Sequence, residues 1–97
     1  MGGEIKAGQW IWVMVQDPGG KEQFFGLHDE KEGTSFIPVF LEKEIALQCF
    51  INMPRESGKR YEAQAILYED LADQSSRNGF YLHFLDTEGR VIEKIKP

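Results

Sequence analysis

Hydrophobic and polar positions follow the period of β-strands over the first part of the chain. Residues 10–15 are rich in β-branched and aromatic side chains and precede a Pro-Gly-Gly turn signal, so we expect a strand that ends there. A shorter strand at 22–27 follows at the spacing of an antiparallel hairpin. The polar run 28–33 predicts a solvated loop before a third strand at 35–40. Because Pro38 cannot donate a ladder hydrogen bond, we expect a free edge or a bulge at that point.

From Glu42 the period changes to about 3.6, which is typical of an amphipathic helix. Glu42 and Glu44 lie in the expected first turn, where carboxylates oppose the positive end of the helix dipole, and Pro54 ends the helix. The apolar positions that fall on one helical face are Ile45, Ala46, Cys49, Phe50 and Met53.

The second half of the chain continues with alternating and helical patterns. Residues 61–67 alternate as in a half-buried strand. A short helix is expected at about 69–78, with Gly79 as its left-handed stop. Strands at 80–85 and 90–95 then form a hairpin around a polar turn that ends in glycine. The helix has a thin buried stripe, which consists of Leu71, Ala72 and Ser75.

The resulting order is β-β-β-α-β-α-β-β, which predicts the α+β class. We expect a single mixed β-sheet with both helices packed on it, and right-handed crossovers between parallel neighbours where a helix separates two strands. A chain of 97 residues, with 41% apolar and 28% charged side chains, has room for one core. We therefore expect one domain over residues 1–97, with a flexible N-terminal segment at 1–8.

Charge and composition narrow the class of partner. The chain carries a net charge of −5, from 16 acidic against 11 basic side chains, and no segment gathers a basic stripe. That sign opposes phosphate binding, so we expect no nucleic-acid partner. No apolar run reaches the length of a membrane span, and residues 1–8 lack the features of a signal peptide. Since Cys49 is the only cysteine, we expect a reducing, cytoplasmic location without membrane contact.

Several residues have the chemistry of a site but not its spacing. His28 with its acidic neighbours matches neither a zinc helix nor a calcium loop, so we interpret residues 28–33 as a solvated loop. His83 alternates with apolar residues and is expected to face outward from its strand. Cys49 lies on the apolar face of the first helix, which favours core packing over reactivity. We therefore expect no catalytic residue, no metal and no cofactor.

The aromatic residues suggest a surface for a partner. Trp10 and Trp12 share one strand face, which leaves two alternatives: a helix buries them, or they are displayed to a partner. Large exposed aromatics are typical of interfaces. With Phe24 and Phe25, the two tryptophans form the candidate interface. The acidic residues around the two helices would steer a basic partner surface, although a solvated helix face is the default interpretation.

Residues 36–41, followed by the helix at 42–50, carry the only family resemblance. The sequence Phe-Ile-Pro-Val-Phe-Leu and the helix after it resemble the Pro-Val-Phe strand and adjoining Glu/Ala/Phe helix of SseB-like domains, small α/β proteins without an established reaction. Beyond these residues only the order of elements agrees. The resemblance implies a small helper or interaction domain, and it supplies no site residues.

Two hypotheses of function follow. The first is a noncatalytic cytoplasmic protein-interaction or regulatory module that binds a protein partner or a second copy of itself as a homodimer. The alternative is a small-ligand-binding protein or minor enzyme, with His83, Tyr81 and Glu62 lining a pocket between sheet and helices.

Overall fold

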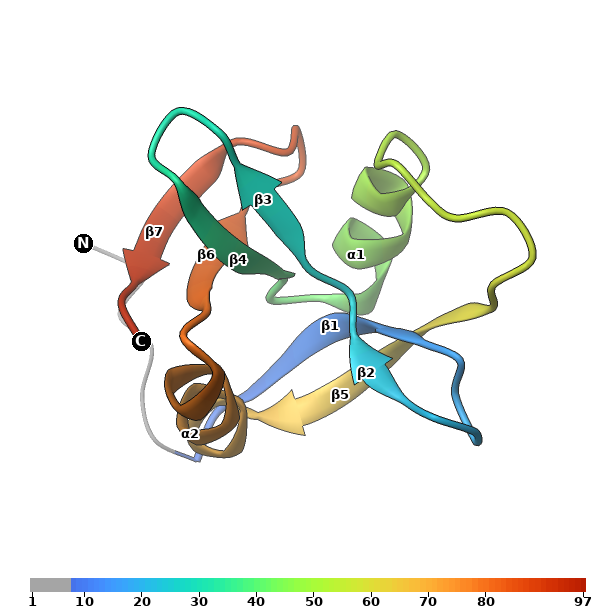
Figure 1. Ribbon diagram of the computed structural model, residues 1–97, viewed down its shortest axis with the longest axis horizontal. Helices are drawn as coiled ribbons and strands as arrows, with labels where there is room; N and C mark the ends of the chain where they lie inside the picture. The colour runs from blue at the N-terminus through green and yellow to red at the C-terminus, as the bar shows by residue number, and fades with distance from the viewer. Residues whose placement is uncertain (1–7) are drawn as a thin grey trace.

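The computed structural model describes residues 8–97, which fold into seven strands and two helices (Figure 1). This confirms the α+β class. The predicted flexible segment at 1–8 lies outside the described residues, except for Gly8. The elements are β1 (Trp10–Gln16), β2 (Gln23–Phe24), β3 (Leu27–Asp29), β4 (Thr34–Val39), α1 (Lys43–Phe50), β5 (Tyr61–Leu67), α2 (Tyr68–Asn78), β6 (Tyr81–Leu85) and β7 (Val91–Ile95).

The strands form two sheets in the described part of the chain, so the prediction of a single mixed sheet is wrong. The first sheet has the order β2-β1-β5 and the second has the order β3-β4-β6-β7. They meet where the Trp12 N–H donates to Phe40 O at 2.8 Å and the Phe40 N–H donates back to Trp12 O at 2.9 Å. The split is favoured by β1, whose residues are apolar on both faces and can be covered from two sides.

The helices connect the two sheets instead of crossing over within one. α1 leads from β4 in the second sheet to β5 in the first, and α2 leads back to β6. The expected crossover between parallel neighbours is therefore absent around each helix of residues 8–97. β4 and β6 are parallel, but α1, β5 and α2 together form the connection between them.

The predicted strand at 22–27 is divided between the sheets. Its first part, β2, pairs with β1, and its end begins β3, which pairs with β4 and extends into the predicted loop as far as Asp29. Phe25 still donates its N–H to Met14 O at 2.8 Å, so the chain changes sheet at Gly26. The β3 ladder ends at Phe36, which leaves β4 without a described partner on that side at Pro38 and confirms the expected free edge.

Both predicted helices are present. α1 ends at Phe50, earlier than expected, and turns lead from there to Pro54. α2 follows β5 directly and ends as predicted: Gly79 adopts φ +76°, and the Phe80 N–H donates to Ser75 O at 2.8 Å. The buried positions of α2 include Leu71 and Ser75, as the thin stripe in the sequence predicts.

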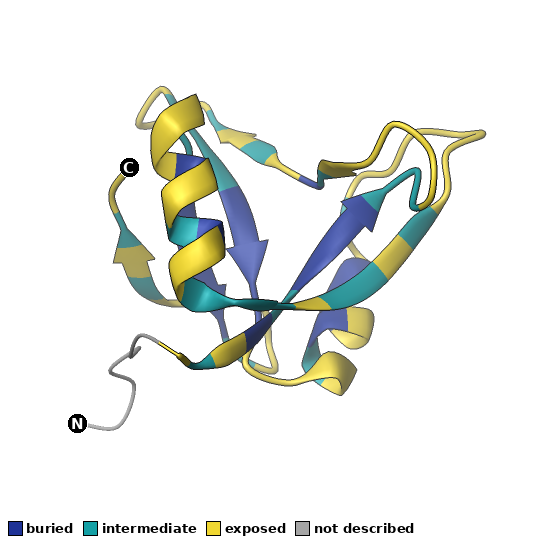
Figure 2. Cartoon of the chain, turned by 90° about the horizontal axis from the view of Figure 1, so that it is seen from below, coloured by how far each residue is buried: buried dark blue, intermediate teal, exposed yellow. Residues whose placement is uncertain are grey.

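Two apolar clusters lie on opposite faces of β1. Figure 2 shows the buried positions along the strands of both sheets, with exposed positions on the outer sides of the helices. One cluster joins β1 to the second sheet and α2, and contains Ile11, Val13, Val15, Ile37, Val39, Leu71, Leu82 and Phe84. The other joins the opposite face of β1 to α1 and contains Met14, Phe25, Phe40, Ala46, Cys49, Phe50 and Leu85.

Candidate functional site

β5 is bonded to a strand on one side only among residues 8–97. It pairs with β1 along its whole length, from Trp10 opposite Leu67 to Gln16 opposite Tyr61, and it lies at the end of the strand order of its sheet. We call the unpaired side of β5 the open edge. Figure 1 shows β5 beside β1, and β2 pairs with the other side of β1.

The hydrogen bonds at the two ends of this pair fix which backbone groups face the open edge. The Tyr68 N–H donates to Gln9 O, and the Asp17 N–H donates to Arg60 O, both at 2.8 Å. In an antiparallel ladder bonded and non-bonded pairs alternate, so the even-numbered residues of β5 bond to β1. The N–H and C=O groups of Ala63 and Ala65 therefore point away from β1, towards the open edge.

The side chains of β5 do little to block this edge. Residues 63–67 read Ala-Gln-Ala-Ile-Leu and carry no charge. The one acidic or basic side chain of β5 is Glu62. Edge strands of natural proteins are commonly protected by charges, prolines or bulges. β5 lacks these features over residues 63–67, which leaves it able to accept another strand.

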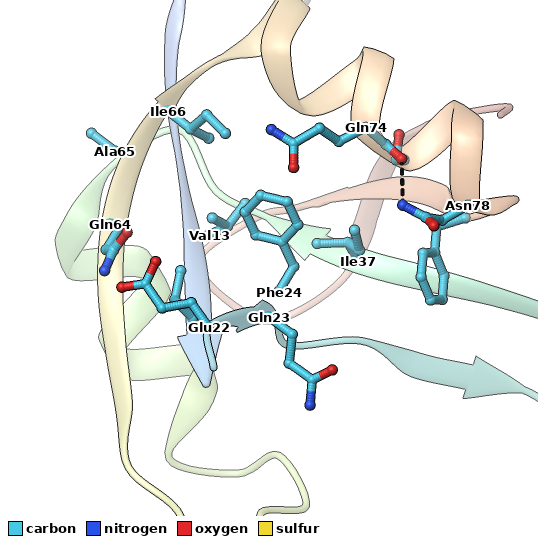
Figure 3. Close-up of a pocket in the computed structure, with 13 residues that line it drawn as sticks. Val13, Glu22, Gln23, Phe24, Ile37, Gln64, Ala65, Ile66, Gln74 and Asn78 are labelled. Carbon is cyan, nitrogen blue, oxygen red and sulfur yellow. Dashed lines mark hydrogen bonds between the residues drawn. The ribbon is translucent and has the colours of Figure 1, made fainter. Parts of the chain in front are cut away.

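A cavity of about 620 Å³ lies on the inner face of the first sheet, between β5, β2 and the C-terminal half of α2 (Figure 3). Its apolar floor and wall are Val13, Val15, Phe24, Ile37, Ile66 and Phe80. Its polar rim is Glu22, Gln23, Gln64, Gln74 and Asn78, and the buried Ser75 also lines it. Because Ala65 also lines the cavity, the cavity extends to the open edge of β5.

The rim has the chemistry of a site for neutral or positively charged groups. Carboxamides both donate and accept hydrogen bonds, so Gln64 and Gln74 can pair with backbone groups of a ligand. Glu22 supplies a carboxylate, one oxygen of which accepts the Gly19 N–H at 2.7 Å. No basic side chain of residues 8–97 forms an ion pair with Glu22.

The candidate interface residues lie in different environments. Trp10 is 59% exposed, and Trp12 is half-buried with Lys43 Nζ 5.8 Å from its ring centre, so the two tryptophans differ in exposure although they share a strand face. Phe24 is half-buried and projects into the cavity. Phe25 is buried and packs edge-on against Phe50, with 5.0 Å between ring centres, so it belongs to the core and not to the surface.

His83 is buried, so the expectation of an exposed strand residue is wrong. It lies on the opposite face of β6 from Leu82 and Phe84, but the Phe36 ring stacks on it at 4.0 Å. Its Nε2 atom has no hydrogen-bond partner among the described residues. Burial, together with nearby Lys94, lowers the pKa of His83. The cause of the burial is a cross-strand aromatic neighbour, which alternation within one strand does not reveal.

The three residues of the alternative hypothesis do not form one pocket. The Tyr81 and His83 rings lie 6.4 Å apart on β6, whereas Glu62 is on β5 in the other sheet. None of them lines the cavity beside β5 or a second cavity of about 540 Å³ next to β2 and β3.

The remaining candidates serve the fold. His28 Nδ1 lies 3.3 Å from Ser35 Oγ, and Asp29 accepts the Lys31 N–H at 3.0 Å within the turn after β3. Cys49 is buried, its pKa is raised by that burial and by Asp86, and its Sγ donates to the Asp86 carbonyl at 3.4 Å. Within residues 8–97 no group of three or more His, Cys, Asp or Glu residues is arranged to hold a metal ion, and neither helix is long and apolar enough to span a membrane.

Comparison of the chain with protein-family models, curated proteins and solved structures found no match. The resemblance of residues 36–50 to SseB-like domains therefore stays a prediction.

The cavity and its rim were not found by sequence reasoning. Its lining comes from β1, β2, β4, β5, α2 and Phe80, and these segments are brought together by the two-sheet arrangement. The available signal was the uncharged run at 63–67, which includes Gln64 and is unusual for a strand at a sheet edge.

Proposed function

We propose that this protein is a noncatalytic protein-interaction module that binds an extended segment of a partner along the open edge of β5. The observation that carries the proposal is the outward direction of the N–H and C=O groups of Ala63 and Ala65 in an uncharged edge strand. Addition of a strand to a sheet edge is a recurrent mode of peptide recognition. The exposed indole of Trp10, on the neighbouring strand, supports a contact surface on the α1 side of the same sheet.

Backbone pairing alone does not give a stable complex. Ala63 and Ala65 offer four outward groups, and each hydrogen bond contributes about 1 kcal/mol net. Association costs about 4–15 kcal/mol in lost translational and rotational freedom. Side-chain contacts must therefore supply most of the affinity, and the cavity and Trp10 lie on the two faces of the sheet where such contacts would form.

The partner in this proposal is a protein segment or a second copy of the chain, in the cytoplasm. Two copies of β5 can pair antiparallel, which would give a homodimer. The lone Cys49, buried and without a disulfide, supports a reducing compartment.

Selection from a displayed library of random peptides tests the proposal. We expect enrichment of peptides that bind the wild type, and loss of their binding to Ala65→Pro, which removes one outward N–H without breaking a bond to β1. Ala65→Ser keeps that N–H and is the matched control. The proposal is wrong if selection enriches nothing, or if the enriched peptides bind Ala65→Pro as well as they bind the wild type.

The size of the cavity favours a second candidate function, which is binding of a small molecule. Cavities of several hundred cubic ångströms with an apolar floor and a few polar groups are typical of ligand sites. A melting-temperature screen against neutral and cationic metabolites would support this candidate if a compound stabilises the wild type but not Gln74→Trp, which fills the mouth of the cavity.

A further inference from the structure

We infer that the cavity beside β5 is the anchor pocket for one long apolar side chain of the bound segment, and that basic residues flank this anchor. The inference rests on the proposed function, because it assumes that the segment pairs with the open edge. It names the chemistry of the partner, which backbone pairing by itself leaves undefined.

The register of the sheet connects the open edge to the cavity. Side chains of an added strand alternate between the two faces of the sheet. Those on the inner face would lie next to Gln64 and Ile66, which both line the cavity. Figure 3 shows Gln64, Ala65 and Ile66 along β5, with the ring of Phe24 beyond them and Gln74 above. A bound segment would thus direct every second side chain towards the mouth of the cavity.

Strand spacing sets the length of the anchor. Neighbouring strands are about 4.8 Å apart, so an added strand would lie roughly 10 Å from β1, whose Val13 and Val15 form part of the floor. A side chain as short as alanine or valine would end before it reaches the cavity. Methionine and phenylalanine are the longer apolar side chains and extend furthest past Gln64 towards the apolar lining of the cavity. The apolar floor therefore selects a long apolar residue at one inward position.

Charge decides between a partner segment and a second copy. Glu22 on the rim and the exposed Glu62 on β5 form no ion pair within residues 8–97. A second copy that pairs through β5 would bring its own Glu62 to the same edge, together with a further net charge of −5. A segment with lysine or arginine beside the anchor would instead neutralise these carboxylates. The observations therefore favour a basic peptide segment over self-pairing.

Fluorescence polarisation with synthetic peptides tests the inference on the whole chain. The probe is a labelled threonine-rich peptide with a lysine at each end and one phenylalanine, which is moved through every internal position to find the register. We expect one register, or two registers separated by two residues, to bind roughly ten- to a hundredfold more tightly than the same peptide with alanine in place of phenylalanine. Replacement of the lysines by glutamate should weaken binding, and added salt should reduce the difference.

Protein variants separate the anchor from the edge. Gln74→Trp should remove the preference for phenylalanine over alanine, while Gln48→Trp, on the exposed side of α1, should retain it. Ala65→Pro should abolish binding of all the peptides. Peptides N-methylated at alternate residues provide the same test without altering the protein, since only one of the two methylation patterns should block pairing.

Each contrary result identifies what fails. If binding depends on Ala65 but is equal for phenylalanine and alanine peptides, the anchor is overturned and the proposed function remains. If no peptide binds, or if neither Ala65→Pro nor either methylation pattern has an effect, the proposed function itself is overturned. A dimer of the free protein that Ala65→Pro dissociates would show that a second copy occupies the edge, and would overturn the inference. Binding of N-acetylphenylalanine amide to Ala65→Pro, with no binding of the peptides to the wild type, would overturn it in favour of a small-ligand site.

Discussion

The edge strands β5 and β7 belong to different sheets and are protected to different degrees. β7 has five residues, including Glu93 and Lys94, and a register shift opposite Phe84 and Leu85 interrupts its ladder with β6. Lys94 also forms an ion pair with Glu32 at 3.3 Å. β5 has seven residues in regular register and a five-residue stretch without charge.

This difference indicates where the molecule can accept a strand. Charges and bulges on an edge oppose pairing with other chains, and an unprotected edge is prone to it. β7 exposes Val91 and Ile92, at 45% and 54%, yet the bulge and the charges that follow them disrupt a continuous pairing surface. Of these two edges, β5 is therefore the less protected against pairing with another strand.

The largest expected effect is that of a substitution at the junction of the two sheets, which tests whether the sheets unfold as one unit. Phe40 is fully buried, and its backbone bonds to Trp12 join the sheets. We expect Phe40→Ala to lower the free energy of unfolding by about 3–5 kcal/mol, because it leaves a large cavity at the junction. Denaturant unfolding should show a single transition, with tryptophan fluorescence and far-ultraviolet circular dichroism coinciding. Leu41→Ala, at the partly exposed next residue, is the control, and two separate transitions would show that the sheets fold separately.

A pair of proline variants tests the assignment of inward and outward groups within β5. Gln64→Pro removes an N–H that bonds to β1, and we expect it to cost about 1–3 kcal/mol of stability. Ala65→Pro removes an outward N–H and should change stability by less than about 1 kcal/mol. Thermal melting of the two variants measures the difference. Equal destabilisation would contradict the assigned phase of the ladder and, with it, the open edge.

The elements could be predicted from the sequence because they depend on local periodicity. The strand at 61–67 and the stop of α2 at Gly79 were predicted at their observed positions, since alternation and a left-handed glycine are local signals. The division into two sheets was not predicted, because it depends on which strands pair: β1 pairs with β5 in one sheet and β4 pairs with β6 in the other, and these partners are distant in the chain. An apolar run such as 10–15 is equally compatible with a strand in a single sheet and with a strand that is covered by apolar clusters on both faces.

The candidate site was only partly predictable for the same reason. Aromatic composition identified Trp10, which is exposed, but it also selected Phe25, whose burial depends on Phe50 and Tyr61 from elsewhere in the chain. The edge position of β5 is a property of strand order, which the sequence does not specify locally. Gln64 and Gln74 were not considered as site residues, because no spacing of glutamines along a sequence is typical of a binding site. Only the fold brings these two side chains to the rim of one cavity.

A smaller effect is expected in the second sheet, where the buried His83 should make the free energy of unfolding depend on pH. Burial, with a contribution from Lys94, lowers the pKa of His83 below its ordinary value of 6.5, while Asp29 and Glu32 oppose this. The unfolded chain therefore takes up a proton at His83 before the folded chain does. The contribution of the neutral His83 to the free energy of unfolding should be fully present above pH 6.5. It should decrease as the pH falls below 6.5, towards the lowered pKa of the folded state.

His83→Phe should remove that part of the pH dependence. Unfolding free energies of the wild type and the variant, measured on acidification from neutral pH through 6.5, provide the comparison. If the difference between them does not change with pH, the ring is not held in its neutral form by the surrounding side chains.

The smallest expected effect on stability concerns the α1 side of the first sheet. Trp10 is 59% exposed and lies opposite Leu67, whereas Trp12 is half-buried and lies opposite Ala65. Because little of its area is covered, Trp10→Phe should change the free energy of unfolding by less than about 0.5 kcal/mol. Acrylamide should quench the fluorescence of Trp12→Phe, which retains Trp10, more strongly than that of Trp10→Phe. Strong protection of Trp10 that disappears on dilution would mean that a second copy covers this face, and it would contradict the view that β5 and its surroundings are free for a different partner.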